Sequence, residues 1–308
     1  MDNLSEYFSI DKKVIENNNV IIFDLFNYDS ADKKLFMIYE KGMVITQDDL
    51  KTMLKYNEIY ARMTYKDTYH DLYKKNITNY PIQKEIEEFY ENVSQKISDL
   101  FDNPELSENK KKSEEIINDM IDIVSKDDFA VSSFVTILNY DYYTHTHSLN
   151  VSVYAICLGK HIGLEKKDLV NLGIASLLHD LGKSQIDSNI INKNGKLTDE
   201  EFTEVKNHPY YGCLIAQTIG INNKDILEGI RFHHEKIDGS GYPKGLKNDK
   251  IPLYARIISI CDAFDAISTK KSYKASISSF DTLVLMKKEM SNSFDTSLIN
   301  SFIVMLRG

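Results

Sequence analysis

Histidine is concentrated in one part of this 308-residue chain, and that clustering constrains the fold more than any other feature of the sequence. Seven of the eight histidines lie between residues 145 and 234. The densest stretch pairs His233 with His234 just before a glycine-rich run at residues 238–243. A single histidine is more often a hydrogen-bonded core residue or a surface residue, but chance is a poor explanation for the whole set. We interpret the set as metal ligands that the fold must bring together.

The ligand types indicate the chemistry of such a site. Imidazole and carboxylate ligands without thiolate suit iron, manganese or zinc used for hydrolysis, whereas a structural zinc site more often includes cysteine. The three cysteines, Cys157, Cys213 and Cys261, are widely spaced, and each lies in an apolar run. We therefore expect them to be buried thiols.

Several separated motifs occur in an order that resembles the HD-GYP family, a branch of the HD metal-dependent phosphohydrolases whose characterised members cleave cyclic di-GMP. The resemblance runs from about Asp127 to the C-terminus. It implies a mainly α fold with an all-helical HD-type catalytic domain. The motifs are, in chain order, His147, His179-Asp180-Leu181-Gly182-Lys183, His208-Pro209, His233-His234-Glu235, Asp238-Gly239-Ser240-Gly241-Tyr242-Pro243 and Asp262.

The resemblance also implies a role for each matching residue. One metal would have two histidine and two aspartate ligands, namely His147, His179, Asp180 and Asp262. Asp180 would bridge to a second metal with three histidine ligands, namely His208, His233 and His234. Asp180 and Lys183 are the expected catalytic residues, and Lys183 would contact the substrate phosphate. The expected substrate-binding residues are Lys183, Gly241, Tyr242, Pro243, Lys271 and Lys274.

Two departures from the family pattern limit this transfer. Some members hold a third metal with a glutamate four residues before the first histidine, where this chain has Tyr143. We therefore expect two metals. Lys271 and Lys274 occupy positions where family members usually carry arginine to grip the nucleotide. Lysine keeps the charge but loses the planar bidentate donors of arginine, so the affinity for guanine or phosphate stays open.

The chemistry of the substrate explains why such a site needs two metals. A phosphodiester resists hydrolysis because it is anionic and its alkoxide is a poor leaving group. Two bridged metals lower the pKa of a shared water and neutralise phosphate oxygens, and a lysine offsets charge that grows on the phosphate. The predicted function is hydrolysis of cyclic di-GMP to pGpG, or onward to GMP, by a metal-activated water at a bimetallic site. The expected cofactors are two divalent transition-metal ions, iron or manganese, between which these ligands do not distinguish.

Two alternative functions stay open. The same hydrolysis could act on another cyclic dinucleotide, such as a mixed guanine-adenine one. The chain could instead be a non-catalytic cyclic-dinucleotide receptor or adaptor that acts through protein contacts. The complete ligand set favours catalysis.

Composition limits the partners. The net charge of −9 argues against duplex nucleic acid or an anionic membrane as the main partner. No stretch approaches the roughly 20 apolar residues of a membrane span. Residues 1–6 lack the basic and apolar regions of a signal peptide. We expect a cytoplasmic protein whose partner is cyclic di-GMP.

The chain is longer than one typical domain, and its patterns predict three parts. Residues 1–78 would form a small α/β regulatory or docking module, with β-type runs at 20–23, 35–39 and 59–63 and with Thr46 as a helix N-cap. Residues 79–126 would be a helical linker, because apolar residues recur at helical spacing over 86–100 and 116–124. Those helices would cover a core or form a homodimer or signalling-partner contact. Residues 127–308 would be the HD-GYP catalytic domain.

Helix signals place the motifs within that catalytic part. We expect helices from His147 toward residue 162, over 169–178 with Gly182 as the terminator, from Thr198 with a capping box, and over 251–267. Asp265 would hydrogen-bond a ligand histidine. The remaining histidines, His70, His145 and His161, are expected to lie on the surface or to point away from the ligands.

Overall fold

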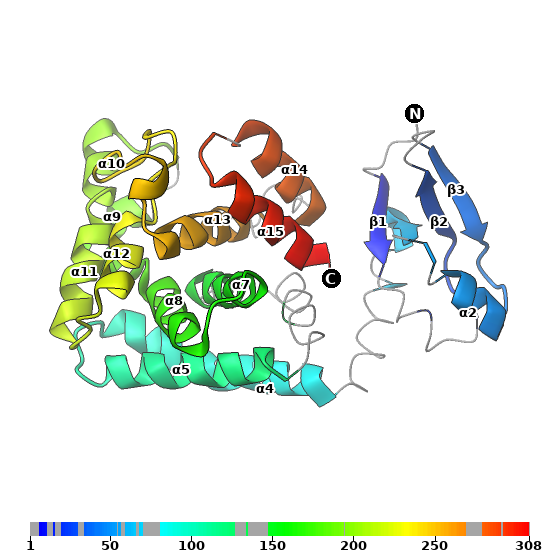
Figure 1. Cartoon of the computed structure of the whole chain (residues 1–308), viewed down its shortest axis with the longest axis horizontal. Helices are drawn as coiled ribbons and strands as arrows, with labels where there is room; N and C mark the ends of the chain where they lie inside the picture. The colour runs from blue at the N-terminus through cyan, green and yellow to red at the C-terminus, as the bar shows by residue number, and fades with distance from the viewer. Residues whose placement is uncertain are drawn as a thin grey trace. The chain divides into compact units, whose positions relative to one another are not determined.

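The computed structural model describes residues 6–10, 15, 20–29, 34–53, 55–56, 59–65, 68–69, 81–126, 134, 147–193, 195–268, 279–290 and 292–307. The chain divides into two compact units, residues 1–84 and 85–308, with the division inside helix α4 (Pro81–Asp102) (Figure 1). The three-part division expected from the sequence stays a prediction. Within the described ranges, no helix combines the length and the apolar character needed to cross a membrane.

The first unit is built on a four-stranded antiparallel sheet with the strand order β1-β4-β2-β3. Leu25, Ile59 and Ala61 are fully buried, so the two central strands carry the core of this unit. A short helix, α2, and one 3-10 turn, η2, complete its described elements. Their bounds are β1 (Tyr7–Ile10), β2 (Leu25–Asp29), β3 (Lys34–Tyr39), α2 (Gln47–Met53), β4 (Ile59–Arg62) and η2 (Met63–Tyr65).

Two of the three strands expected in this unit are confirmed, as β3 and β4. The strand expected at residues 20–23 is wrong, because Val20 forms only an isolated bridge and β2 begins at Leu25. Ile21 and Phe23 of that run are nevertheless buried, whereas Val20 is exposed, so the apolar pattern indicated core contacts and not a strand. The predicted cap of α2 is confirmed, since Thr46 Oγ1 accepts a hydrogen bond from the Asp49 amide at 3.2 Å.

The second unit is helical throughout its described residues (Figure 1). Three short 3-10 or α segments, η3, α9 and η4, connect longer helices. The bounds are α5 (Asn109–Val124), α7 (His147–His161), α8 (Lys166–Leu178), η3 (Leu181–Gln185), α9 (Ser188–Ile191), α10 (Asp199–Val205), α11 (His208–Thr218), α12 (Lys224–Phe232), η4 (Asn248–Lys250), α13 (Leu253–Ser268), α14 (Ser279–Glu289) and α15 (Thr296–Arg307).

Helix α7 lies at the centre of this unit. Its residues 148–159 are all buried, and it packs against α8, α13 and α15. The Tyr154 ring meets Phe264 edge-on, with ring centroids 5.1 Å apart. Helix α5 packs closely on α8, because a Cβ at Gly173 would lie 2.6 Å from the Ile117 side chain. Tight packing of this kind holds the ends of α7, α8 and α13 in fixed positions.

The helix predictions for this unit are mostly confirmed. Helix α7 begins at His147, α8 ends at Leu178, and Thr198 and Glu201 form the expected capping box. The second apolar stripe lies on α5 and covers the core. The prediction for Gly182 is wrong: α8 ends before it, and a Cβ there would lie 2.0 Å from the His208 carbonyl oxygen. The close approach of η3 to α11, not a helix end, requires glycine at this position.

Candidate metal centre

Most of the predicted ligands lie at or next to helix ends, and these ends meet in one place. His147 and His208 are the first residues of α7 and α11, His179 follows α8, and His233 follows α12. Asp262 is the exception, since it lies inside α13. Side chains at helix ends can converge without displacing the packed core between the helices.

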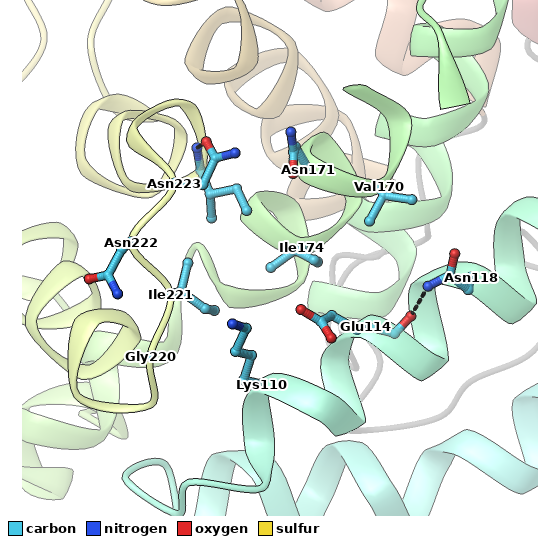
Figure 2. A pocket seen from close by; sticks show the side chains of 11 residues that line it. Lys110, Glu114, Asn118, Val170, Asn171, Ile174, Gly220, Ile221, Asn222 and Asn223 are labelled. Carbon is cyan, nitrogen blue, oxygen red and sulfur yellow. Dashed lines mark hydrogen bonds between the residues drawn. The ribbon is translucent and has the colours of Figure 1, made fainter. Parts of the chain in front are cut away.

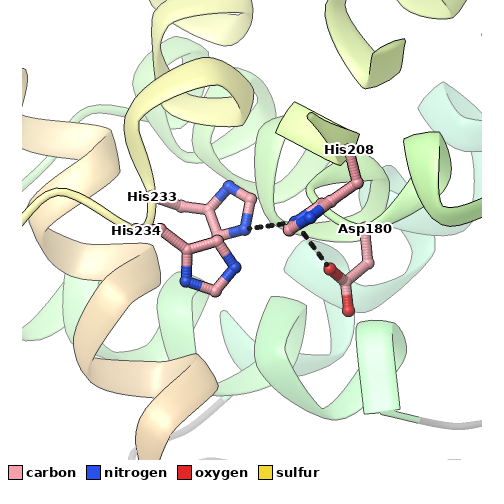
Figure 3. Close-up of side chains that lie close together, drawn as sticks. All are labelled: Asp180, His208, His233 and His234. Atoms are coloured by element: carbon pink, nitrogen blue, oxygen red, sulfur yellow. Dashed lines mark hydrogen bonds and ion pairs between the residues drawn. The ribbon is translucent and has the colours of Figure 1, made fainter. Parts of the chain in front are cut away.

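The structure brings all seven predicted ligands together. The ligand atoms of one set lie within 4.8 Å of one another, and those of a second set do the same; Asp180 belongs to both. Figure 3 shows the first set, with the imidazole rings turned toward the carboxylate. Asp262 joins the second set through its Oδ1, which is 3.2 Å from His147 Nε2. The sets are Asp180, His208, His233 and His234, and then His147, His179 and Asp180.

Three of the imidazoles are oriented by the same hydrogen bond. In each, Nδ1 donates to the backbone carbonyl three residues earlier at 2.7 Å, which commits the proton to Nδ1 and leaves the Nε2 lone pair to face the cluster. The pairs are His179 with Ser176, His208 with Val205, and His233 with Ile230.

His147 is oriented by a carboxylate instead. Its Nδ1 is 2.7 Å from Asp265 Oδ2, and Asn150 Nδ2 donates to Asp265 Oδ1 at 3.0 Å. The prediction that Asp265 hydrogen-bonds a ligand histidine is therefore confirmed. Such a carboxylate fixes the ring orientation and increases the basicity of the nitrogen that faces a metal.

Most of these rings are neutral at neutral pH. Burial lowers the pKa of His179, His208 and His233, and it lowers the pKa of His234 to about 3. Neutral imidazole is the form that binds metal. His147 differs: burial lowers its pKa, but hydrogen bonds to Asp262 and Asp265 outweigh that effect and raise it to about 10.

The residues present fit a divalent cation. His208 Nε2 and His233 Nε2 are 3.3 Å apart, and two lone pairs at that distance repel unless a cation lies between them. Among the described residues, neither Asp180 Oδ1 nor His179 Nε2 has a hydrogen-bond partner, although both atoms are buried. An unsatisfied buried polar group costs about 1–3 kcal/mol, so several in one place indicate a bound ion. Nitrogen and carboxylate donors suit a first-row transition metal.

Lys183 borders the cluster without belonging to the ligand sets. Its Nζ donates to Asp180 Oδ2 at 2.6 Å, and its side chain is 40% exposed. Burial lowers the pKa of Lys183, but the Asp180 carboxylate outweighs this and keeps it above its ordinary value. A charged ammonium therefore lies beside the ligands and open to solvent, as the predicted phosphate contact requires.

The predicted substrate loop lies against one of the ligands. The Tyr242 ring stacks on His234, with centroids 4.7 Å apart and planes at 24°, and Pro243 follows it. Gly241 approaches the backbone so closely that a Cβ would lie 2.4 Å from the His234 carbonyl oxygen. The conformation of residues 239–246 is thus tied to the position of the metal ligands.

Glu235 holds this loop, a role that no sequence pattern indicated. Its carboxylate is buried and accepts hydrogen bonds from the amides of Lys244, at 2.7 Å, and Leu246, at 2.8 Å. The partners are backbone atoms around a turn, so nothing in their side chains reveals the contact. The one available signal in the sequence was a glutamate directly after His233-His234.

Some predicted site residues lie outside the described part of the chain. These are Lys271, Lys274, Tyr143 and His145. The prediction of buried thiols is confirmed: Cys157, Cys213 and Cys261 are free and buried, and burial raises the pKa of Cys157 to about 12 and of Cys213 to about 11.

A separate pocket of about 260 Å³ lies between α5, α8 and the loop that leads into α12 (Figure 2). Its lining includes asparagine side chains, one lysine, one glutamate and several apolar side chains. It contains no imidazole and a single carboxylate, Glu114, so it lacks the donors of a metal centre. The chemistry indicated by the sequence therefore belongs to the histidine cluster.

A helical unit with a histidine and aspartate cluster at its helix ends is the architecture of a metal-binding HD domain. The family model for the HD domain matches residues 114–298, and the chain belongs to this family. The expected family resemblance and the mainly α fold are both confirmed. The chain is similar over its length to a solved structure, Bd1817, a HDG"Y"P protein from Bdellovibrio bacteriovorus (TM-score 0.62, 21% identity, 98% of this chain and 100% of that one). At this identity the likeness supports the fold.

Curated relatives are similar over about half of the chain. The chain is 35% identical over 174 residues to the cyclic di-GMP phosphodiesterase PA4108 of Pseudomonas aeruginosa, covering 56% of this chain and 42% of the relative. It is 35% identical over 153 residues to the 3'3'-cGAMP-specific phosphodiesterase 3 of Vibrio cholerae, covering 50% of this chain and 33% of the relative. The chain thus spans less than half the length of these relatives.

Proposed function

We propose that this chain hydrolyses a phosphodiester bond of cyclic di-GMP, giving pGpG or, after a second cut, GMP. The observation that carries the proposal is a cluster of seven candidate ligand side chains in two sets, both of which include Asp180. Among the described residues, His179 Nε2 and Asp180 Oδ1 in this cluster are buried without a hydrogen-bond partner. The similarity to a cyclic di-GMP phosphodiesterase supports the substrate class.

Each residue has a role that follows from its contacts. Asp180 would bridge two metals, since both ligand sets include it. His147, His179 and Asp262 would complete one site, and His208, His233 and His234 the other. Two bound divalent metals would supply Lewis acidity, which lowers the pKa of water and neutralises phosphate charge. We propose iron or manganese, because neutral imidazole with carboxylate suits both.

The remaining groups would bind and orient the substrate. Lys183 would turn its ammonium from Asp180 toward the phosphate, where it offsets charge in the transition state. Tyr242, held flat against His234, offers an aromatic edge to the nucleotide. Gly241 and Pro243 shape the loop, and Lys271 and Lys274 would grip the nucleotide.

A second candidate substrate is a mixed guanine-adenine cyclic dinucleotide. The observation that favours it is the similarity to a relative named as 3'3'-cGAMP-specific, at the same 35% identity as the cyclic di-GMP relative. A receptor without turnover is a third possibility. Contacts between two copies, or with a signalling protein, through the first unit or through α4 and α5 belong to the same set of proposals.

Anaerobic purification followed by metal analysis and product chromatography tests the proposal. We expect about two transition metals per chain, because Tyr143 replaces the potential third-site carboxylate and a phenol is a poor ligand. The same preparation should convert cyclic di-GMP to pGpG, and parallel reactions with mixed and all-adenine cyclic dinucleotides rank the substrates. A fully metal-loaded protein that binds these nucleotides without cleaving any would instead establish the receptor.

A further inference from the structure

A lysine outside the metal centre is held between two aromatic rings at the edge of the substrate loop. Lys206 directly follows α10, and its Nζ lies 4.4 Å from the centroid of the Phe202 ring. The same Nζ lies 6.0 Å from the centroid of Tyr242. Because Tyr242 stacks on His234, one aromatic ring separates this ammonium from a candidate ligand.

The ammonium of Lys206 is available to an anion. Within the described residues, no carboxylate forms an ion pair with it, whereas Lys183 is paired with Asp180 and Lys193 with Glu201. Cation–π contacts attract an ammonium without neutralising it, so its charge remains available. Phe202, which is 45% exposed, supplies one of those rings on the solvent side.

Helix α10 is fixed where it carries these residues. Thr198 Oγ1 accepts a hydrogen bond from the Glu201 amide at 3.2 Å, and Glu201 Oε2 accepts one from the Thr198 amide at 2.7 Å. Lys193 Nζ lies 2.6 Å from both carboxylate oxygens of Glu201. A helix capped and pinned in this way presents Phe202 and Lys206 in a defined position.

We infer that Lys206, positioned by Phe202, binds the second phosphate of the cyclic dinucleotide, the one that is not being cleaved. This inference rests on the proposed function. A cyclic dinucleotide carries two phosphates on opposite sides of its ring. The phosphate being cleaved has to lie at the ligand cluster beside Lys183, so the other needs a cation beyond Tyr242. Lys206 is a charged group that lies beside Tyr242 without a carboxylate partner among the described residues.

The test compares a substrate with two phosphates and a substrate with one. Lys206→Gln removes the charge, Lys206→Arg keeps it, and Phe202→Leu removes the ring that positions it. Lys224→Gln is the matched control, because that lysine pairs with Glu228 on the exposed side of α12. Each protein is assayed for metal content, for kcat and KM on cyclic di-GMP and on bis(p-nitrophenyl) phosphate, and for the Kd of cyclic di-GMP by calorimetry.

We expect Lys206→Gln to raise the KM and Kd for cyclic di-GMP about tenfold, the usual loss for one charge-assisted contact, with metal content and kcat within about twofold. Phe202→Leu should raise KM by a smaller factor, and Lys206→Arg should restore most of the affinity. The increase should be clearly smaller on bis(p-nitrophenyl) phosphate.

Equal increases on both substrates, or no change in KM and Kd, would overturn the inference. If the wild type binds cyclic di-GMP but does not cleave it, the proposed function fails, and the Kd of Lys206→Gln still decides the inference. If the wild type neither binds nor cleaves a cyclic dinucleotide, both fail.

Discussion

The two halves of the metal centre share Asp180 but are built from different chemistry. The imidazole half, formed by His208, His233 and His234, consists of neutral rings, and the side chains of His208 and His233 are 0–1% exposed. The carboxylate half, formed by His147, His179 and Asp262, reaches the surface: the His147 side chain is 36% exposed and the Asp262 side chain 20%. His234 is half-buried and His179 is fully buried, so the centre opens to the surface mainly at His147 and Asp262.

The difference extends to what orients the ligands. In the imidazole half, His208 and His233 are held by carbonyls three residues earlier, so the local chain sets their geometry. In the carboxylate half, His147 is held by Asp265, which is 118 residues away in the sequence. The packing of α7 on α13 therefore fixes His147, whereas His179 and the imidazole half depend on carbonyls of their own chain segments. A perturbation of that packing should separate the two halves.

Asp180→Ala should have the largest effect, because it removes the residue that both halves share. We expect loss of metal from both halves and a fall in turnover well beyond the roughly hundredfold cost of one electrostatic contact. Elemental analysis and turnover on one preparation measure this. Asp122→Ala, an exposed partner of Lys166, is the control. Retention of two metals with full activity would show that Asp180 does not bridge.

Lys183→Ala should come next, since it leaves both halves intact and removes a charge beside them. We expect unchanged metal content and hydrolysis slowed on the order of a hundredfold or more. Lys166→Ala, which removes the exposed partner of Asp122, controls for the loss of a lysine elsewhere in the unit. A wild-type rate for Lys183→Ala would remove this residue from the chemistry.

Local signals in the sequence predicted much of this site. The capping box at Thr198, the start of α7 at His147 and the end of α8 at Leu178 all depend on residues within a few positions. Asp265 was predictable because it lies close to Asp262 on the same helix. These features require no knowledge of which helices pack together.

Contacts between distant segments were not predictable. Gly182 was assigned to a helix end because glycine is common there, but its requirement comes from the backbone of α11. The contact between Lys206 and Tyr242 joins a helix and a loop that no pattern pairs. In the apolar run at residues 20–23, Ile21 and Phe23 are buried, and burial does not specify a strand. Each error reflects tertiary packing that overrides a local preference.

Asp265→Asn should affect the carboxylate half alone, because Asp265 contacts His147. The amide keeps the shape but loses the charge that orients His147, and outer-shell changes of this kind typically cost about 10–100-fold in metal affinity. We expect one ion to be lost at lower chelator concentration while the other is retained. Asp168→Asn, the same loss of charge at a carboxylate that accepts a hydrogen bond from the Tyr254 hydroxyl, is the control. Equal weakening of both ions would show that the halves are not independent.

The smallest expected effect concerns two buried thiols and how well the core around them excludes water. Cys157 lies on α7, which begins at His147, and Cys213 lies on α11, which begins at His208. Burial raises the pKa of the first thiol to about 12 and of the second to about 11. Because the folded pKa is raised, the stabilisation that each thiol contributes is fully present below the unfolded pKa of about 9. It is lost progressively as the pH rises from that value toward the folded pKa. Between pH 7 and 9.5 each thiol should therefore lower the free energy of unfolding by about 0.8 kcal/mol.

Urea titrations at the two pH values, for the wild type, Cys157→Ala and Cys213→Ala, isolate each contribution as a difference in pH dependence. The constant cost of each substitution cancels from that difference. We expect both variants to lose less stability than the wild type as the pH rises, by similar amounts. If Cys157→Ala showed the same pH dependence as the wild type while Cys213→Ala showed a reduced one, water would reach the core around Cys157. The Cys157 thiol would then ionise as readily in the folded state as in the unfolded state, and such a thiol contributes nothing to the pH dependence of the free energy of unfolding.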